Sequence, residues 1–170
     1  MNTFFILAQL LNLGIFTAFI LARKEKPEAK PLIDVRAIQL LRLTYLLPII
    51  AFAWSLFLVE YVTPLDWVCL LIAIAGTVLV VKGKIDLGTH HTWAGYYLPH
   101  AQRIHSGIFS WIAHPMYAGI IMVILSCSAV YVTRLPWYIS ALALLCCAYI
   151  SLFLIVVALR EEKLFVTAKA

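Results

Sequence analysis

Two short polar motifs bracket the last two apolar stretches of the chain, and they contain the side chains best suited to chemistry. The segment from His114 to Gly119 (HPMYAG) opens one apolar stretch, and the segment from Arg160 to Lys163 (REEK) closes the next. If the two stretches are antiparallel helices, both motifs lie at the same end of the pair. The pattern therefore predicts a polar site at one end of an otherwise apolar hairpin.

The two motifs offer different binding groups. Pro115 suits the first turn of a helix, where its missing N–H would have no partner, and the free N–H groups there can bind an anion. We expect Glu161 and Glu162 to lie at a helix C-terminus, where acids oppose the helix dipole. An acid kept in that position favours a cationic partner. Because adjacent helical residues point about 100° apart, only one of the two can point fully into a site.

The segment between residues 83 and 114 is the most polar and aromatic part of the chain. It contains all five histidines of the chain and also four aromatic residues, Trp93, Tyr96, Tyr97 and Trp111. A metal site is disfavoured, because Asp86 is the only acid in the segment and no ligand spacing is evident. An interfacial loop with its rings at headgroup level is an alternative, and it is compatible with substrate binding.

Together, these groups match one small molecule. A helix N-terminus can bind a carboxylate, an acid can bind an ammonium, and aromatic rings can bind an adenine or a sulfonium. S-adenosylmethionine has all four groups. If a catalytic base is needed, His105 and Tyr97 are candidates, and the sequence does not choose between them.

Composition shows where such a site must lie. The chain has 170 residues, of which 64% are hydrophobic and only 12% charged, whereas soluble domains have about 25% charged residues. We therefore expect one integral membrane domain over residues 1–170, an all-α bundle of about five spans. The predicted spans are Thr3–Ala22, Leu43–Val62, Trp67–Val81, Phe109–Val132 and Trp137–Leu159.

The distribution of basic residues predicts the orientation. Of the 13 Lys and Arg residues, 12 fall on one side of the membrane in this layout, and only Arg134 falls on the other. Basic residues mark the cytoplasmic side, so we expect the N-terminus outside, the C-terminus inside, and both motifs facing the cytosol. The net charge of +5 is explained by topology, and we expect no nucleic-acid partner. A prokaryotic plasma membrane is favoured, and the endoplasmic reticulum stays an alternative.

The second half of the chain resembles the isoprenylcysteine carboxyl methyltransferase family, within the wider group that includes phospholipid N-methyltransferases. Residues 106–119 (SGIFSWIAHPMYAG) are similar to the family pattern S-G-P-Y-R-Y-V-R-H-P-x-Y-x-G, and Glu161-Glu162 matches its later E-E pair. Leu87-Gly88, with Trp93 beyond it, resembles the family's loop before this motif. The resemblance covers roughly residues 85–165.

The resemblance implies an S-adenosylmethionine site and a lipid or lipid-linked acceptor that reaches it laterally between helices. It implies that the cofactor is bound by His114, Pro115, Tyr117, Gly119, Glu161, Glu162 and Gly107. We expect Trp93, Tyr96 and Trp111 to contact the substrate.

The family's Arg before His-Pro is Ala113 here, and its Pro-Tyr is Ile108-Phe109. We expect a lipid or lipid-linked acceptor such as a prenylcysteine carboxylate, with a phospholipid amine as the alternative, and an isoprenoid and a small thiol also stay open. A nicotinamide-dependent sterol reductase and a non-catalytic scaffold are the rival classes. The oligomeric state stays open.

Overall fold

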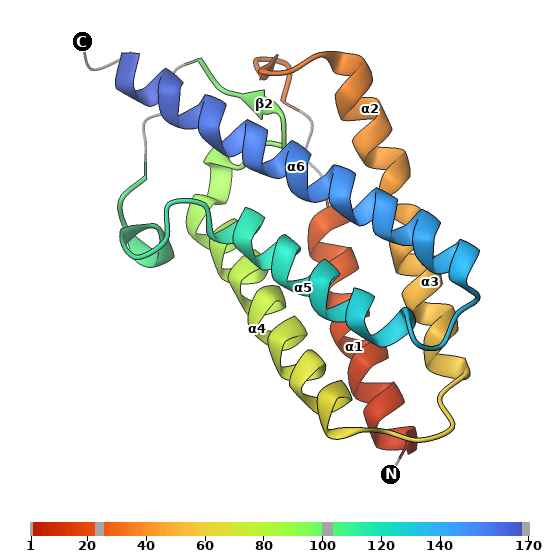
Figure 1. Ribbon diagram of the computed structural model, residues 1–170. Coiled ribbons are helices and arrows are strands. Elements are labelled where there is room, and N and C mark those ends of the chain that lie inside the picture. Colours follow the sequence, from red (N-terminus) through yellow and green to blue (C-terminus); the bar gives the residue numbers. More distant parts are fainter. Residues whose placement is uncertain (1, 23–25, 100–103, 168–170) are drawn as a thin grey trace.

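The computed structural model describes residues 2–22, 26–99 and 104–167, and it is an all-α helical bundle, as predicted (Figure 1). α1 begins at one end of the bundle and α6 ends at the other. The helices are α1 (Asn2–Leu21), α2 (Val35–Thr44), α3 (Leu46–Phe57), α4 (Pro64–Leu87), α5 (Pro115–Tyr131) and α6 (Trp137–Thr167). Two 3-10 turns, η1 (Gly88–His90) and η2 (Gly107–Ser110), and two short strands, β1 (Lys30–Pro31) and β2 (Tyr96–Tyr97), complete the described elements.

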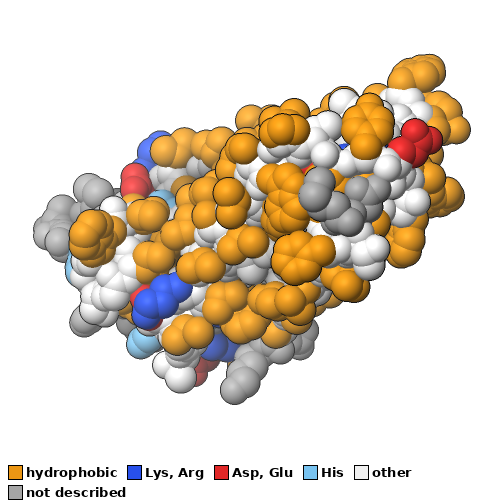
Figure 2. Space-filling model, turned by 90° about the horizontal axis from the view of Figure 1, so that it is seen from below, with side chains coloured by type: hydrophobic (Ala, Val, Ile, Leu, Met, Phe, Trp, Pro, Cys, Tyr) orange, Lys and Arg blue, Asp and Glu red, His pale blue; other side chains and the backbone are white. Residues whose placement is uncertain are grey.

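The described helices have the length and composition of a membrane protein. Four segments are long and apolar enough to cross a bilayer: Thr3–Leu21, Val35–Phe57, Pro64–His90 and Trp137–Leu164. α5 is apolar but has 17 residues, which gives a rise of about 26 Å against a hydrocarbon thickness of about 30 Å. Hydrophobic side chains cover most of the face shown in Figure 2, and charged ones are few. The chain is therefore an integral membrane protein.

Two helices extend beyond the predicted spans, and both extensions contribute to the site. α4 continues past Val81 to Leu87, because Lys82 and Asp86 lie one turn apart and form an ion pair of 2.6 Å. α6 continues past Leu159 to Thr167. The expectation that the Glu161-Glu162 pair ends a helix is therefore wrong, and so is the dipole argument built on it.

Two other predicted spans are divided or shortened. The second span begins earlier than predicted, at Val35, and breaks at Tyr45 between α2 and α3. Pro48 lacks the N–H that would bond the Thr44 carbonyl, which accounts for the break. The fourth span begins at Pro115 rather than Phe109, because the residues around Phe109 form the separate turn η2.

α5 packs against α4 through two glycines. A Cβ added to Gly119 would lie 2.4 Å from the carbonyl oxygen of Gly76, and one added to Gly76 would lie 2.6 Å from the carbonyl oxygen of Gly119. Small residues at such a crossing let two membrane helices approach with their backbones in contact. This contact fixes the beginning of α5, with its His-Pro motif, beside the end of α4.

A buried ion pair ties the helices together at the other end of the bundle. Thr63 and Asp66 form a capping box at the start of α4. Asp66 Oδ1 also accepts a hydrogen bond of 2.7 Å from Arg134 Nη2, and the two side chains are 7% and 12% exposed. The turn between α5 and α6 is thereby held against α4.

Candidate functional site

A cavity of about 340 Å³ opens where the end of α4, the start of α5 and the last turns of α6 meet the segment after α4. Its volume is near the lower end of the range of about 300–1,000 Å³ for small-molecule pockets. Residues from α1 and from the α2–α3 junction complete the wall. The predicted site residues on the wall are His114, Pro115, Tyr117, Glu161, Glu162, Trp93, Tyr96 and Tyr97.

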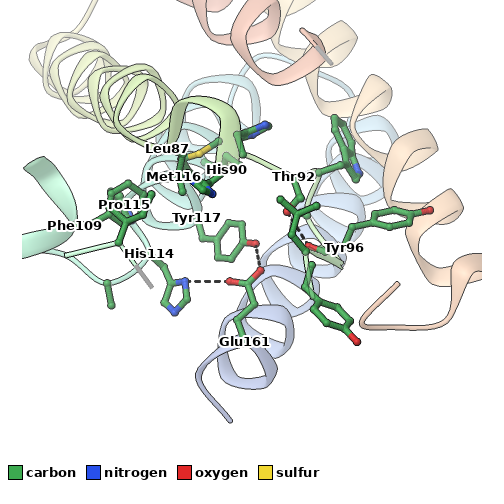
Figure 3. Close-up of a pocket in the computed structure, with 18 of the residues that line it drawn as sticks. Leu87, His90, Thr92, Tyr96, Phe109, His114, Pro115, Met116, Tyr117 and Glu161 are labelled. Atoms are coloured by element: carbon green, nitrogen blue, oxygen red, sulfur yellow. Dashed lines mark hydrogen bonds and ion pairs between the residues drawn. The ribbon is translucent and has the colours of Figure 1, made fainter. Parts of the chain in front are cut away.

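Glu161 is the polar centre of this cavity. Tyr117 Oη donates a hydrogen bond of 2.7 Å to its Oε1, and His114 Nδ1 lies 3.4 Å from its Oε2 (Figure 3). The His114 and Tyr117 rings are nearly parallel, at 5°. The two motifs, more than 40 residues apart in sequence, therefore meet through side chains, as the hairpin argument predicted.

The two acids of the pair have different environments. The Glu161 side chain is 19% exposed, whereas that of Glu162 is 46% exposed and lies 3.6 Å, at Oε1, from His114 Nε2. This difference follows from the angle of about 100° between successive helical side chains. Glu161 is thus the acid that points into the cavity, with Glu162 on its rim.

The start of α5 gives the cavity a set of free backbone donors. His114 is the N-cap residue, its side chain makes no capping hydrogen bond, and Pro115 occupies the first turn. The N–H groups of Met116 and Tyr117 therefore have no acceptor within the helix. With the positive end of the helix dipole, they can bind an anionic group such as a carboxylate.

Aromatic side chains form the opposite wall. Tyr96 and Tyr97 lie on β2, which pairs antiparallel with β1 and so holds this segment against the α1–α2 connection. The Trp93 ring makes an edge contact with Tyr45, and the guanidinium of Arg42 lies 5.8 Å from the Trp93 ring centre. The flat faces of such rings can stack on a purine or a sulfonium.

His91 adds an uncharged imidazole to the wall. Burial, with Lys84 and Lys26 nearby, lowers the pKa of His91 to about 4. The ring is therefore neutral at physiological pH and available as a hydrogen-bonding group. Within the part of the chain that the structure describes, no group of three or more His, Cys, Asp or Glu side chains is placed to bind a metal ion.

Four predicted site residues do not line the cavity. Gly119 lies in the α4–α5 crossing described above, Gly107 packs on Asp86, His105 is exposed, and Trp111 is 90% exposed. Gly119 is held in the α4–α5 crossing, whereas His105, Gly107 and Trp111 lie in or beside η2, from which Phe109 does reach the cavity wall. The structure thus places these four residues off the cavity wall, and their predicted contacts with cofactor or substrate stay predictions.

Gly107 has a structural role instead. Its φ is +61°, and an added Cβ would lie 2.3 Å from Asp86 Oδ2. The same oxygen accepts a hydrogen bond of 2.9 Å from the Ile108 N–H. Glycine is needed for this close approach, which fixes η2, and with it Phe109 on the cavity wall, to the end of α4.

Sequence reasoning missed several residues of the wall. Phe19 and Ile20 come from α1, and Tyr45 from the α2–α3 junction. Phe19 and Ile20 give no sequence signal, because they are apolar residues in an apolar span. Tyr45 did give one, since it is a polar-tipped residue inside a predicted span. His100, a further loop histidine, lies outside the described residues.

The fold and the site define a class of protein, an integral membrane helix bundle with a polar cavity at one end. A model of the phospholipid methyltransferase family matches residues 66–168, well over half of the chain. The chain therefore belongs to the phospholipid methyltransferase family. No curated protein matches it, and no solved structure does.

Proposed function

We propose that the protein is an S-adenosylmethionine-dependent methyltransferase that methylates the amine headgroup of a membrane lipid at the cytosolic face. Membership of the phospholipid methyltransferase family supports methyl transfer to a lipid. The strong bias of Lys and Arg to one side of the predicted layout supports the cytosolic face. The proposal depends chiefly on one observation, that the partly buried Glu161 and the start of α5, which has no side-chain cap, line the same cavity.

The residues present fit the cofactor's chemical groups. The first turn of α5 has free N–H groups and no side-chain cap, which suits a carboxylate. Glu161, partly buried beside it and hydrogen-bonded to Tyr117, suits an ammonium. Trp93, Tyr96 and other rings of the wall suit an adenine. An α-amino carboxylate attached to an adenosine presents these three groups together.

The charge of the wall favours an amine acceptor. The described lining residues include two acids, Glu161 and Glu162, and no Lys or Arg. Ala113, at the position where the isoprenylcysteine carboxyl methyltransferase pattern has Arg, lines the cavity. A carboxylate acceptor would bring its reacting anion next to Glu161 and Glu162, and like charges repel. An ammonium headgroup would find compensating charge there.

The side chains of the wall also suit the chemistry of an amine. When bound, S-adenosylmethionine supplies an electrophilic sulfonium methyl, which a neutral amine accepts in one displacement with release of S-adenosylhomocysteine. An ammonium headgroup must first lose a proton. Glu162, on the rim beside His114, gives that proton a route to solvent. The residues of the cavity wall would bring donor and acceptor together for this displacement.

A competition between two acceptors tests the proposal. Purified protein would receive methyl-labelled S-adenosylmethionine with equal amounts of a phosphatidylethanolamine and N-acetyl-S-farnesylcysteine. We expect label in the amine lipid. Label in the prenylcysteine alone would overturn the amine assignment and leave the cofactor assignment intact. Binding of NADPH, with no binding of S-adenosylhomocysteine, would overturn both in favour of a reductase.

A further inference from the structure

The cavity has an apolar part that the cofactor's polar groups do not explain. Phe19 and Ile20 of α1 line it together with Met116 and Ile120 of α5 and Leu87 of α4. Ile20 is 8% exposed and Ile120 is 4% exposed. These side chains belong to the same cavity as Glu161, so a ligand that fills it has both a polar and an apolar part.

α1 is fastened at this point. Lys84, near the end of α4, donates hydrogen bonds to the carbonyl oxygens of Phe19 and Ala22, at the end of α1. Lys26, just beyond α1, donates to the carbonyl oxygen of Thr89. The carbonyls at a helix end otherwise lack partners. These bonds hold the Phe19 and Ile20 side chains in the cavity wall.

The start of α5 connects the apolar part of the cavity to its polar part around Glu161. Met116 and Ile120 lie one turn apart on α5, and Tyr117, which contacts Glu161, lies between them in sequence. An acceptor whose amine reaches the methyl donor bound beside Glu161 would therefore extend along Met116 and Ile120. In a phospholipid the phosphate and glycerol follow the amine and the hydrocarbon chains begin beyond them, and Phe19 and Ile20 of α1 line the same cavity as Met116 and Ile120.

We propose that Phe19 and Ile20 form a subsite for the part of the lipid's hydrocarbon chains that lies nearest the headgroup. α1 would thereby select lipid acceptors over free headgroups. This inference rests on the proposed function. α1 lies outside the matched residues 66–168, and the selectivity is therefore assigned to a part of the chain that the family match does not cover.

Two water-soluble acceptors test the subsite without interference from partitioning into the membrane. Dihexanoyl phosphatidylethanolamine has short chains, whereas glycerophosphoethanolamine has the same headgroup and none. The quantity measured is the ratio of their kcat/KM values with methyl-labelled S-adenosylmethionine. We expect the wild type to prefer the dihexanoyl lipid.

Phe19→Ala and Ile20→Ala should each lower this ratio roughly tenfold, because hydrophobic pockets discriminate on that scale. Their affinity for S-adenosylhomocysteine should stay unchanged, which also shows that the variants are folded. Leu21→Ala is the matched control, since Leu21 is the next residue on α1, is 53% exposed and does not line the cavity. Its ratio should equal that of the wild type. If either cavity variant fails to fold, Phe19→Leu or Ile20→Val replaces it, with a smaller shift in the same direction.

The outcomes separate the two proposals. An active wild type whose preference is the same in all variants would overturn the chain subsite and leave the proposed function standing. An equal fall of the ratio in the Leu21 control would also overturn it. A wild type that neither binds S-adenosylhomocysteine nor methylates either acceptor would overturn the proposed function, and the subsite with it.

Discussion

Glu161→Gln isolates the charge at the centre of the cavity. The substitution keeps the size of the side chain and leaves an oxygen to accept the hydrogen bond from Tyr117. It removes the negative charge that we assign to the cofactor's ammonium. The fold should therefore survive, and binding should weaken.

The environment of each acid sets the size of the effect. The Glu161 side chain is 19% exposed, and a hydrogen bond to a charged group at such a site contributes about 1.5–3 kcal/mol. At 1.4 kcal/mol for each factor of ten, the Kd should rise roughly 10- to 150-fold. Glu162, 46% exposed, belongs with surface ion pairs of about 0.2–1 kcal/mol, so Glu162→Gln should raise the Kd at most about fivefold.

Calorimetry with S-adenosylhomocysteine on wild type and both variants in detergent measures these values. Thermal unfolding of the same samples checks that all three are folded. Equal effects of the two substitutions, or a larger effect of Glu162→Gln, would refute the assignment of Glu161 as the ammonium partner. An unchanged Kd in Glu161→Gln would refute it as well.

Three further predictions concern the frame around the site. Gly119→Ala should destabilise the protein by about 1–3 kcal/mol, because its Cβ would meet the Gly76 carbonyl oxygen at 2.4 Å. Gly14→Ala, with nothing within 4 Å, is the control, and equal thermal unfolding of the two variants would contradict the close crossing. Asp86→Ala removes the acceptor of the Ile108 N–H, so hydrogen exchange at residues 107–110 should accelerate; unchanged exchange would count against this anchor. His91 has a pKa of about 4 in the folded state, against an ordinary pKa of 6.5. Between these two pH values the unfolded state therefore binds more protons at His91 than the folded state does. Stability should therefore fall on acidification through that window, and His91→Gln should reduce this fall. Parallel pH profiles of wild type and variant would oppose a buried neutral imidazole.

The fold was accessible from sequence because apolar stretches of membrane length leave the backbone few alternatives. The helix ends were less accessible. Lys82, Lys84 and Asp86 read as a polar loop, yet they continue α4 because their side chains support a helical turn and bind neighbours on α1 and η2. In the same way, the charged residues Glu161 and Glu162 were expected to end a helix, whereas α6 continues past them.

The polar half of the site could be predicted and the apolar half could not. His114, Tyr117 and Glu161 stand out because polar residues are rare in this chain, and helix pairing brings them together. Gly119 and Gly107 belong to the same motif, but they serve backbone contacts, which a sequence pattern does not distinguish from ligand contacts. The α1 residues of the wall become visible only once the helices are packed.

Transfer of label into native lipid tests the central claim most directly. Purified protein in lipid nanodiscs made from native membrane lipids would be incubated with methyl-labelled S-adenosylmethionine, and the labelled product identified by mass spectrometry. The account predicts an N-methylated amine phospholipid formed together with an equal amount of S-adenosylhomocysteine. No labelled lipid above a heat-inactivated control, or label only on a carboxylate, would contradict it.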